Sequence, residues 1–246
     1  MIESIHRLLF STLFISLQSV KPYIKITETL TPEGEPLELI EHDGTFMICS
    51  NGEQLMTSFS HGSEETLAEL ACAPFSPVNQ PKFLIGGLGM GYTLAAATRA
   101  VTKKRATFVV AELTPAIVDW NRSHLSHLNA NLLDDERIEI KIGPVQKAIR
   151  QANSEYHAII LDVDNGPSAF HGKKNDSLYS LQGLREIQHA LKGGGILAVW
   201  SARSDKAFTK TLRKVGFDVS ENAVAAAHKG SKRRTHTIWL ARKKSY

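Results

Sequence analysis

The front part of the chain alternates apolar and polar residues in short segments. Such alternation occurs at residues 23–27, 37–41, 45–49 and 53–57, and it is typical of strands that are buried on one face only. The pairs Asp43-Gly44 and Asn51-Gly52 separate the last three segments. Because these residue pairs tolerate positive φ, they predict tight hairpins. We therefore expect a small antiparallel sheet, followed by a helix that Ser63 caps.

From residue 82 onward, unbroken apolar runs alternate with segments of helical periodicity. Runs at 82–86, 106–112, 138–142, 156–162 and 196–200 are typical of strands that are covered on both faces. Helices are expected at about 90–101, around 115–125, at 181–191 before three glycines, and at 207–215. Segments 219–225 and 235–241 add a terminal strand pair. The pattern predicts an α/β fold with a mostly parallel seven-stranded sheet.

Three regions follow from this division. Residues 1–21 are expected to be an N-terminal helix or leader, residues 22–80 a small β-rich region with one helix, and residues 81–246 a nucleoside-binding catalytic domain. The apolar run at 8–17 is interrupted by Ser and Thr, and no small-residue cleavage site follows it, so we do not expect a signal peptide. The sequence contains no run of about 20 apolar residues, so we expect no membrane span.

Composition and charge narrow the class of protein. Hydrophobic residues make up 42% and charged residues 22% of the 246 residues, as in ordinary globular domains. Seven of the 29 Lys and Arg residues but none of the 25 acids lie after Ala226, so the positive charge belongs to one tail. This distribution does not favour nucleic acid as a partner. Two cysteines predict no disulfide framework and favour the cytoplasm, and the histidines show no metal-ligand spacing.

A glycine-rich turn joins the first buried strand to the next helix. Its glycines are Gly86, Gly87, Gly89 and Gly91. The spacing does not match the dinucleotide fingerprint but is usual in nucleoside-binding methyltransferase-like folds. Glycines at such a join allow backbone amides to approach a ligand closely at a helix N-terminus.

Glu112 ends the next strand, 21 residues after Gly91, and Leu113 follows it. A carboxylate at this place can accept two hydrogen bonds from a ribose diol. The turn, Glu112 and Leu113 together predict a nucleoside site. The alternative is a tight turn beside an exposed acid at a strand end.

Two further acids, Asp162 and Asp164, follow the fourth buried strand. The carboxyl ends of parallel strands meet at one edge of a sheet, where ligands bind. Acids beside a nucleoside can hold a cation or accept a proton from an amine. An Asx turn that caps the loop is the structural alternative.

In these motifs the chain resembles the spermidine synthase family, the polyamine aminopropyltransferases built on the Rossmann-like methyltransferase fold. The matching stretches are residues 84–91, 109–118, 134–143 and 159–167, with 178–179 and 194–198 after them. The resemblance implies transfer of an aminopropyl group from decarboxylated S-adenosylmethionine to a di- or polyamine, without a metal. Glu112 would hold the ribose, and Asp162 would bind and deprotonate the amine. It also implies a homodimer.

The chain departs from the family pattern at several positions. Gly89 stands where the family carries the acid that holds the amino group of the donor, and Pro144 stands where it carries the acid that binds adenine. The family tyrosine of the front helix falls near Ser63. The missing acid at Gly89 removes a repulsion against a donor carboxylate, so S-adenosylmethionine-dependent methyl transfer is an alternative. A non-catalytic nucleoside-binding protein is a third.

Overall fold

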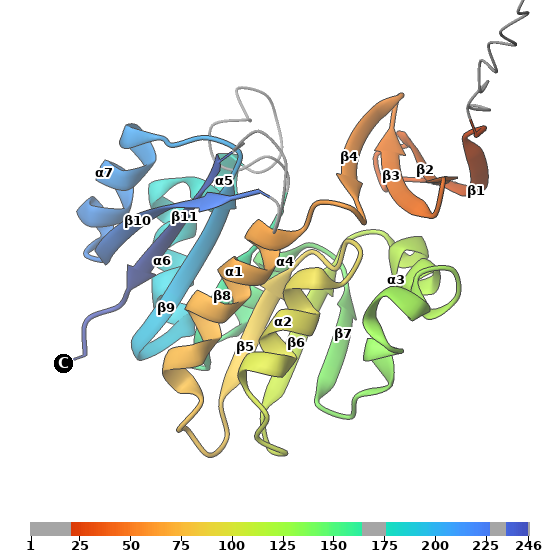
Figure 1. Cartoon of the computed structure of the whole chain (residues 1–246). Helices are drawn as coiled ribbons and strands as arrows, with labels where there is room; N and C mark the ends of the chain where they lie inside the picture. The colour runs from red at the N-terminus through yellow and green to blue at the C-terminus, as the bar shows by residue number, and fades with distance from the viewer. Residues whose placement is uncertain (1–20, 164–175, 227–234, 246) are drawn as a thin grey trace, which may run out of the picture.

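The computed structural model describes residues 21–163, 176–226 and 235–245, which fold into two sheets and their covering helices (Figure 1). The front sheet is antiparallel in the order β1-β2-β3-β4. Its strands are β1 (Ile24–Leu30), β2 (Pro36–His42), β3 (Thr45–Ser50) and β4 (Glu53–Thr57). The two predicted hairpin pairs have positive φ, at 51° and 77° for Asp43 and Gly44 and at 50° and 77° for Asn51 and Gly52.

The main sheet has seven strands in the order β10-β11-β9-β8-β5-β6-β7. Its strands are β5 (Lys82–Gly86), β6 (Thr107–Glu112), β7 (Ile138–Ile142), β8 (Tyr156–Leu161), β9 (Leu191–Ser201), β10 (Asp218–Ala225) and β11 (Thr235–Arg242). Strands β5 to β9 pair in parallel, whereas β10 and β11 are antiparallel. This architecture confirms the predicted α/β class and its mostly parallel seven-stranded sheet.

Helices cover both faces of this sheet. The α-helices are α1 (Gly62–Cys72), α2 (Tyr92–Ala100), α3 (Pro115–Arg122), α4 (Val145–Gln151), α5 (Asp176–Tyr179), α6 (Leu181–Ala190) and α7 (Lys206–Val215). Short 3-10 helices lie at η1 (Ala73–Phe75), η2 (Ser126–Asn129) and η3 (Leu132–Asp134).

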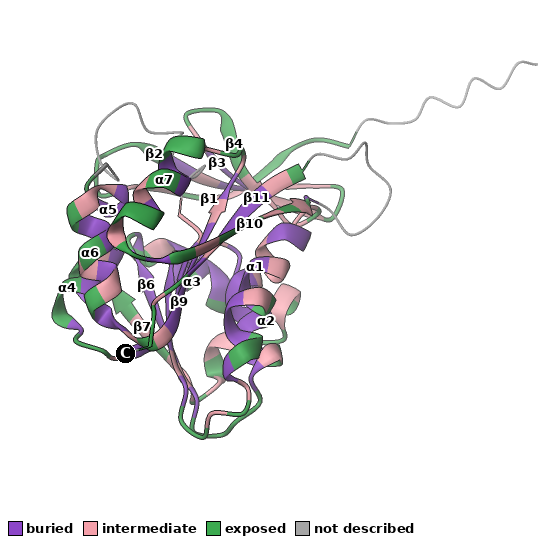
Figure 2. Ribbon diagram, turned by 90° about the vertical axis from the view of Figure 1, so that its left-hand side faces the viewer, coloured by how far each residue is buried: buried purple, intermediate pink, exposed green. Residues whose placement is uncertain are grey.

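The core is divided by the pleat of the strands. Phe83 and Ile85 pack with the buried residues of α1, α2 and α3, whereas Leu84, between them, packs with those of α4, α5, α6 and α7. The central strands are accordingly buried along most of their length (Figure 2). Unbroken apolar runs are required because each strand contacts helices on both sides.

Two local predictions need correction. The helix α1 begins at Gly62 with His61 as its N-cap, so Ser63 lies inside the first turn and does not cap the helix. The helix α6 ends at Ala190, and the glycines after it belong to β9. The glycines join the strand because the amide of Gly194 donates to the Lys243 carbonyl at 3.1 Å, and the Lys243 amide donates to Gly195 at 2.8 Å. Sequence periodicity does not show this pairing with the C-terminal segment.

Within the described ranges, no helix combines the length and the apolar character that a membrane span needs. The region boundaries at residues 21 and 80 stay predictions, although the described front sheet ends before α1.

Candidate functional site

The sheet order brings most of the predicted site residues to one edge. Strands β8, β5 and β6 are neighbours and run parallel, with Gly86 paired to Leu161 on one side and to Ala111 on the other. Asp162 follows β8, the glycine turn follows β5, and Glu112 ends β6. Three sequence-distant motifs therefore surround one place at the carboxyl edge, as ligand sites of open α/β sheets do.

The glycine turn needs its glycines for its backbone shape. Gly87, Gly89 and Gly91 have φ of 84°, 53° and 83°, a region that residues with a Cβ rarely adopt. The Gly87 amide donates to the backbone of β6 at 2.9 Å, and the Gly91 amide donates to the Leu88 carbonyl at 2.8 Å. The turn is thus hydrogen-bonded both to β6 and within itself.

Glu112 is a buried acid, 7% exposed, that lies against this turn. Its Oε2 accepts the Leu88 amide and its Oε1 accepts the Thr114 amide, both at 2.8 Å. Burial raises its pKa, and the backbone amides oppose that change. The amides of Leu113 and Gly89 act on the same carboxyl group, so the backbone of the turn and of the strand end together fix its orientation. Leu113, at the rim, is 41% exposed.

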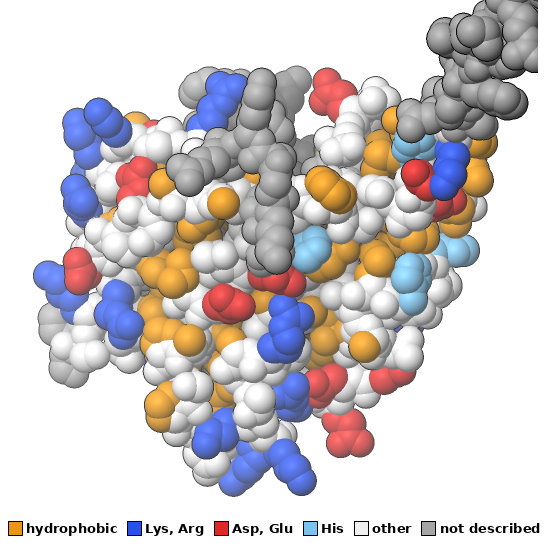
Figure 3. Space-filling model, viewed as in Figure 1, with side chains coloured by type: hydrophobic (Ala, Val, Ile, Leu, Met, Phe, Trp, Pro, Cys, Tyr) orange, Lys and Arg blue, Asp and Glu red, His pale blue; other side chains and the backbone are white. Residues whose placement is uncertain are grey.

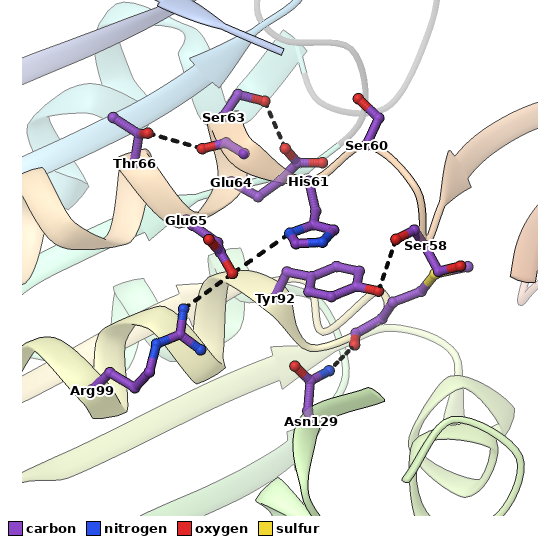
Figure 4. Close-up of polar contacts among 12 residues, drawn as sticks. Ser58, Ser60, His61, Ser63, Glu64, Glu65, Thr66, Tyr92, Arg99 and Asn129 are labelled. Carbon is purple, nitrogen blue, oxygen red and sulfur yellow. Dashed lines mark hydrogen bonds and ion pairs between the residues drawn. The ribbon is translucent and has the colours of Figure 1, made fainter. Parts of the chain in front are cut away.

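Side chains from other elements hold the turn in place. Asn121 Nδ2 donates to the Gly89 carbonyl at 2.7 Å. Asn129 Nδ2 donates to the Met90 carbonyl at 2.6 Å (Figure 4). A Cβ on Gly89 would lie 2.6 Å from Cε of Met56. Met56 belongs to β4, so the front sheet packs directly on the turn. The sequence interpretation missed this contact because it joins two regions that are distant along the chain.

Asp162 lies beside the turn, with its backbone against Gly87. A Cβ on Gly87 would be 3.0 Å from the Asp162 carbonyl oxygen. The hydroxyl of Thr93, in the first turn of α2, donates to Asp162 Oδ2 at 2.5 Å. Burial raises the pKa of Asp162, and the Thr93 hydrogen bond lowers it. Asp164, the other predicted acid, lies outside the described residues.

A polar cluster on α1 and α2 adjoins these groups (Figure 4). The His61 ring stacks on Tyr92 with a centroid distance of 3.9 Å. Glu65 Oε1 lies 3.0 Å from Arg99 and 3.5 Å from His61 Nδ1. Burial, with the charges of Glu65 and Glu64, raises the pKa of Tyr92 to about 12. On the face of the molecule that Figure 3 shows, acidic, basic and histidine side chains lie near one another around the middle.

Two clefts lie elsewhere on the described part of the molecule. One of about 590 Å³ is lined by residues of 102–107 and 135–139, where β6 and β7 begin. Another of about 490 Å³ is lined by residues of 202–204, 221–223 and 235–237. Neither cleft is lined by the glycine turn, Glu112 or Asp162. The candidate site is therefore identified by its sequence motifs and not by the size of a cleft.

A sequence model of the spermine/spermidine synthase domain matches residues 61–219. This match runs from the start of α1 to β10 and includes the glycine turn, Glu112 and Asp162. It leaves out the front sheet and the last strand.

Curated proteins similar to this chain carry a consistent name. The polyamine aminopropyltransferase of Nitrosomonas europaea is 26% identical over 191 residues, which are 72% of this chain and 53% of that protein. That of Sulfolobus acidocaldarius is 27% identical over 112 residues, which are 46% of this chain and 35% of that protein. The chain thus aligns with about half, or less, of the length of these two relatives.

Solved structures share the fold. The spermidine synthase from Thermotoga maritima superposes with a TM-score of 0.69 at 19% identity, covering 90% of this chain and 74% of that one. A probable spermidine synthase from Corynebacterium glutamicum gives 0.60 at 13%, covering 88% and 79%. The domain match covers well over half of the chain, and the fold agrees with it: the chain belongs to the spermine/spermidine synthase family.

Proposed function

We propose that the protein transfers an aminopropyl group from decarboxylated S-adenosylmethionine to a di- or polyamine. The observation that supports this most is the placement of Asp162 beside the glycine turn, with Glu112 on the other side of that turn. Glu112 would then bind the ribose diol of the donor, and Asp162 would bind the amine. The similar curated proteins are named polyamine aminopropyltransferases.

The proposed roles follow from the chemistry of the step. The amine nitrogen attacks the propyl carbon bonded to the sulfonium; the new C–N bond forms as the C–S bond breaks. The bonding electrons go to sulfur and leave 5′-methylthioadenosine. An alkyl amine is protonated at neutral pH, with a pKa of about 10, so it must lose a proton before attack. A carboxylate with a raised pKa is a better acceptor for that proton, and burial gives Asp162 this property.

The turn offers no carboxylate to the amino group of the donor, since Gly89 has no side chain. Met56 Cε and Sδ lie next to Gly89 instead. A thioether neither attracts the donor ammonium nor repels a donor carboxylate. This observation supports S-adenosylmethionine-dependent methyl transfer as the second candidate.

An assay with both donors tests the proposal. The protein is incubated with 1,4-diaminobutane and either decarboxylated or ordinary S-adenosylmethionine, and the products are identified by mass. We expect an aminopropylated amine together with 5′-methylthioadenosine. Asp162→Asn should lower kcat by about 10²- to 10⁴-fold, the usual contribution of a general base. Binding of 5′-methylthioadenosine should be unchanged.

Other results would contradict the proposal. A methylated product formed only from ordinary S-adenosylmethionine would establish the second candidate. If neither donor binds, the site is not an adenosyl site. An Asp162→Asn variant with full activity would remove the proposed base.

A further inference from the structure

Glu64, in the first turn of α1, has a side chain that neighbouring elements fix in place. Ser63 Oγ donates to Glu64 Oε2 at 2.6 Å (Figure 4). The same hydroxyl accepts a hydrogen bond from Trp200 Nε1 at 3.0 Å and lies 2.9 Å from His236 Nδ1. Trp200 is near the end of β9 and His236 near the start of β11. Glu64 is therefore held at the carboxyl edge of the sheet, one strand away from Asp162.

The two acids in the first turn of α1 differ in whether a cation lies near their side chains. Glu65 forms an ion pair with Arg99, and its Oε1 also lies 3.5 Å from His61 Nδ1. Among the described residues, Glu64 has no cation within ion-pair distance. It is nevertheless partly buried, and a carboxylate removed from water without a cation is costly. A cation supplied by a ligand would remove that cost.

The charge of Asp162 acts on Glu64. Burial and the charge of Asp162 raise the pKa of Glu64 to about 7, while the Ser63 hydrogen bond opposes this shift. A like charge disfavours the ionised form of a carboxyl group, and a nearby cation favours it. The other titratable groups around Glu64 are Glu65 and His61 on α1, Tyr92 on α2 and His236 on β11.

We propose that Glu64 is a second acceptor-binding carboxylate, which pairs with an ammonium group of the acceptor while Asp162 receives the attacking amine. This inference rests on the proposed function and extends it to specificity. The attacking amine becomes neutral when Asp162 takes its proton, so it cannot neutralise the negative charge of Glu64. The second nitrogen of a diamine remains charged and can do so. Glu64 thus selects diamines and polyamines over monoamines.

Calorimetric titration without turnover tests this assignment. The probes are 1,4-diaminobutane and 1-aminobutane, added at pH 8 to the protein saturated with 5′-methylthioadenosine. The wild-type protein should bind the diamine at least tenfold more tightly than the monoamine. Glu64→Gln should abolish this preference and leave nucleoside binding unchanged. Glu69→Gln is the matched control, since Glu69 is an exposed acid of the same helix.

Two further measurements separate binding from folding. Ser63→Ala keeps the Glu64 carboxylate but removes its hydrogen bond, so it should weaken diamine binding less than Glu64→Gln does. Lowering the pH from 8 to 6 protonates Glu64 and should weaken diamine binding in the wild-type protein, but much less in Glu64→Gln.

Equal diamine preference in the wild-type and Glu64→Gln proteins would overturn the proposal, and so would a wild-type protein without any preference. Failure of the proposed function has a different signature. In that case the diamine binds through Glu64, but no donor yields an aminopropylated product.

Discussion

At the scale of single residues, the site depends on carboxyl groups that are kept away from water and held by different donors. Backbone amides of Leu88 and Thr114 hold Glu112, whereas the Thr93 hydroxyl holds Asp162. Backbone donors fix the orientation of a carboxylate and stabilise its charged form. The Thr93 hydroxyl opposes the rise that burial causes in the pKa of Asp162, and a raised pKa is what the proposed role of proton acceptor requires.

The cost of burying Asp162 makes a prediction for stability. The pKa of Asp162 is raised in the folded protein, so its ionised form is less favourable there than in the unfolded chain. Asp162→Asn should therefore raise the melting temperature at pH 8, by about 2–4 °C for each kcal/mol gained.

This gain should shrink as the pH falls through the raised pKa, and it should vanish below the ordinary value of 3.8. Thermal unfolding of both proteins from pH 8 to pH 3 measures the difference. A gain that does not depend on pH would show that the charge of Asp162 is not its cause.

The sequence indicates some of these residues and not others. Glu112 and Asp162 are predictable because each ends or follows an apolar run, and strand ends are where α/β sheets bind ligands. Glu64 is not, because an acid in the first turn of a helix already has a local explanation in the helix dipole. Only the contacts of its neighbour Ser63 with Trp200 of β9 and His236 of β11 point to another role.

At the scale of elements, the front sheet and the glycine turn form one unit through Met56. This methionine of β4 packs where Gly89 lacks a side chain. The turn was predictable from its glycines, and the hairpins from Asp43-Gly44 and Asn51-Gly52. The contact between them was not, because periodicity describes an element and not its neighbours.

Gly89→Ala should destabilise the protein through two additive causes. One is the positive φ of 53°, which costs a residue with a Cβ about 1–2 kcal/mol. The other is overlap with Met56 Cε at 2.6 Å, and because the end of the methionine side chain can shift, we expect it to cost about 1 kcal/mol, the lower end of the range for overpacking. Met56→Ala in the same protein should relieve the second cause only. Urea unfolding of the single and double variants measures the coupling between the two positions.

Gly44→Ala provides the control for backbone strain alone. Gly44 has φ of 77°, and its added Cβ would meet nothing within 4 Å. It should show no coupling with Met56→Ala. Strict additivity between Gly89→Ala and Met56→Ala would contradict the packing of β4 on the turn.

At the scale of the whole molecule, the fold follows from patterns that are repeated and local. Apolar runs of strand length separated by helical segments leave few arrangements other than a parallel sheet with helices on both faces. The strand order β10-β11-β9-β8-β5-β6-β7 is a long-range property. It brings β8, β5 and β6 together, and hence Asp162, the glycine turn and Glu112.

The central claim is that an adenosyl group lies at this edge with its ribose diol on Glu112. Calorimetric titration with 5′-methylthioadenosine and its 2′-deoxy analogue, against the wild-type protein and Glu112→Gln, tests it most directly. Because a hydrogen bond to a charged group contributes about 1.5–3 kcal/mol, the wild-type protein should bind the deoxy analogue at least about tenfold more weakly, and Glu112→Gln should bind both nucleosides weakly and nearly equally. Equal affinity of the wild-type protein for the two nucleosides, or no binding of either, would contradict the account.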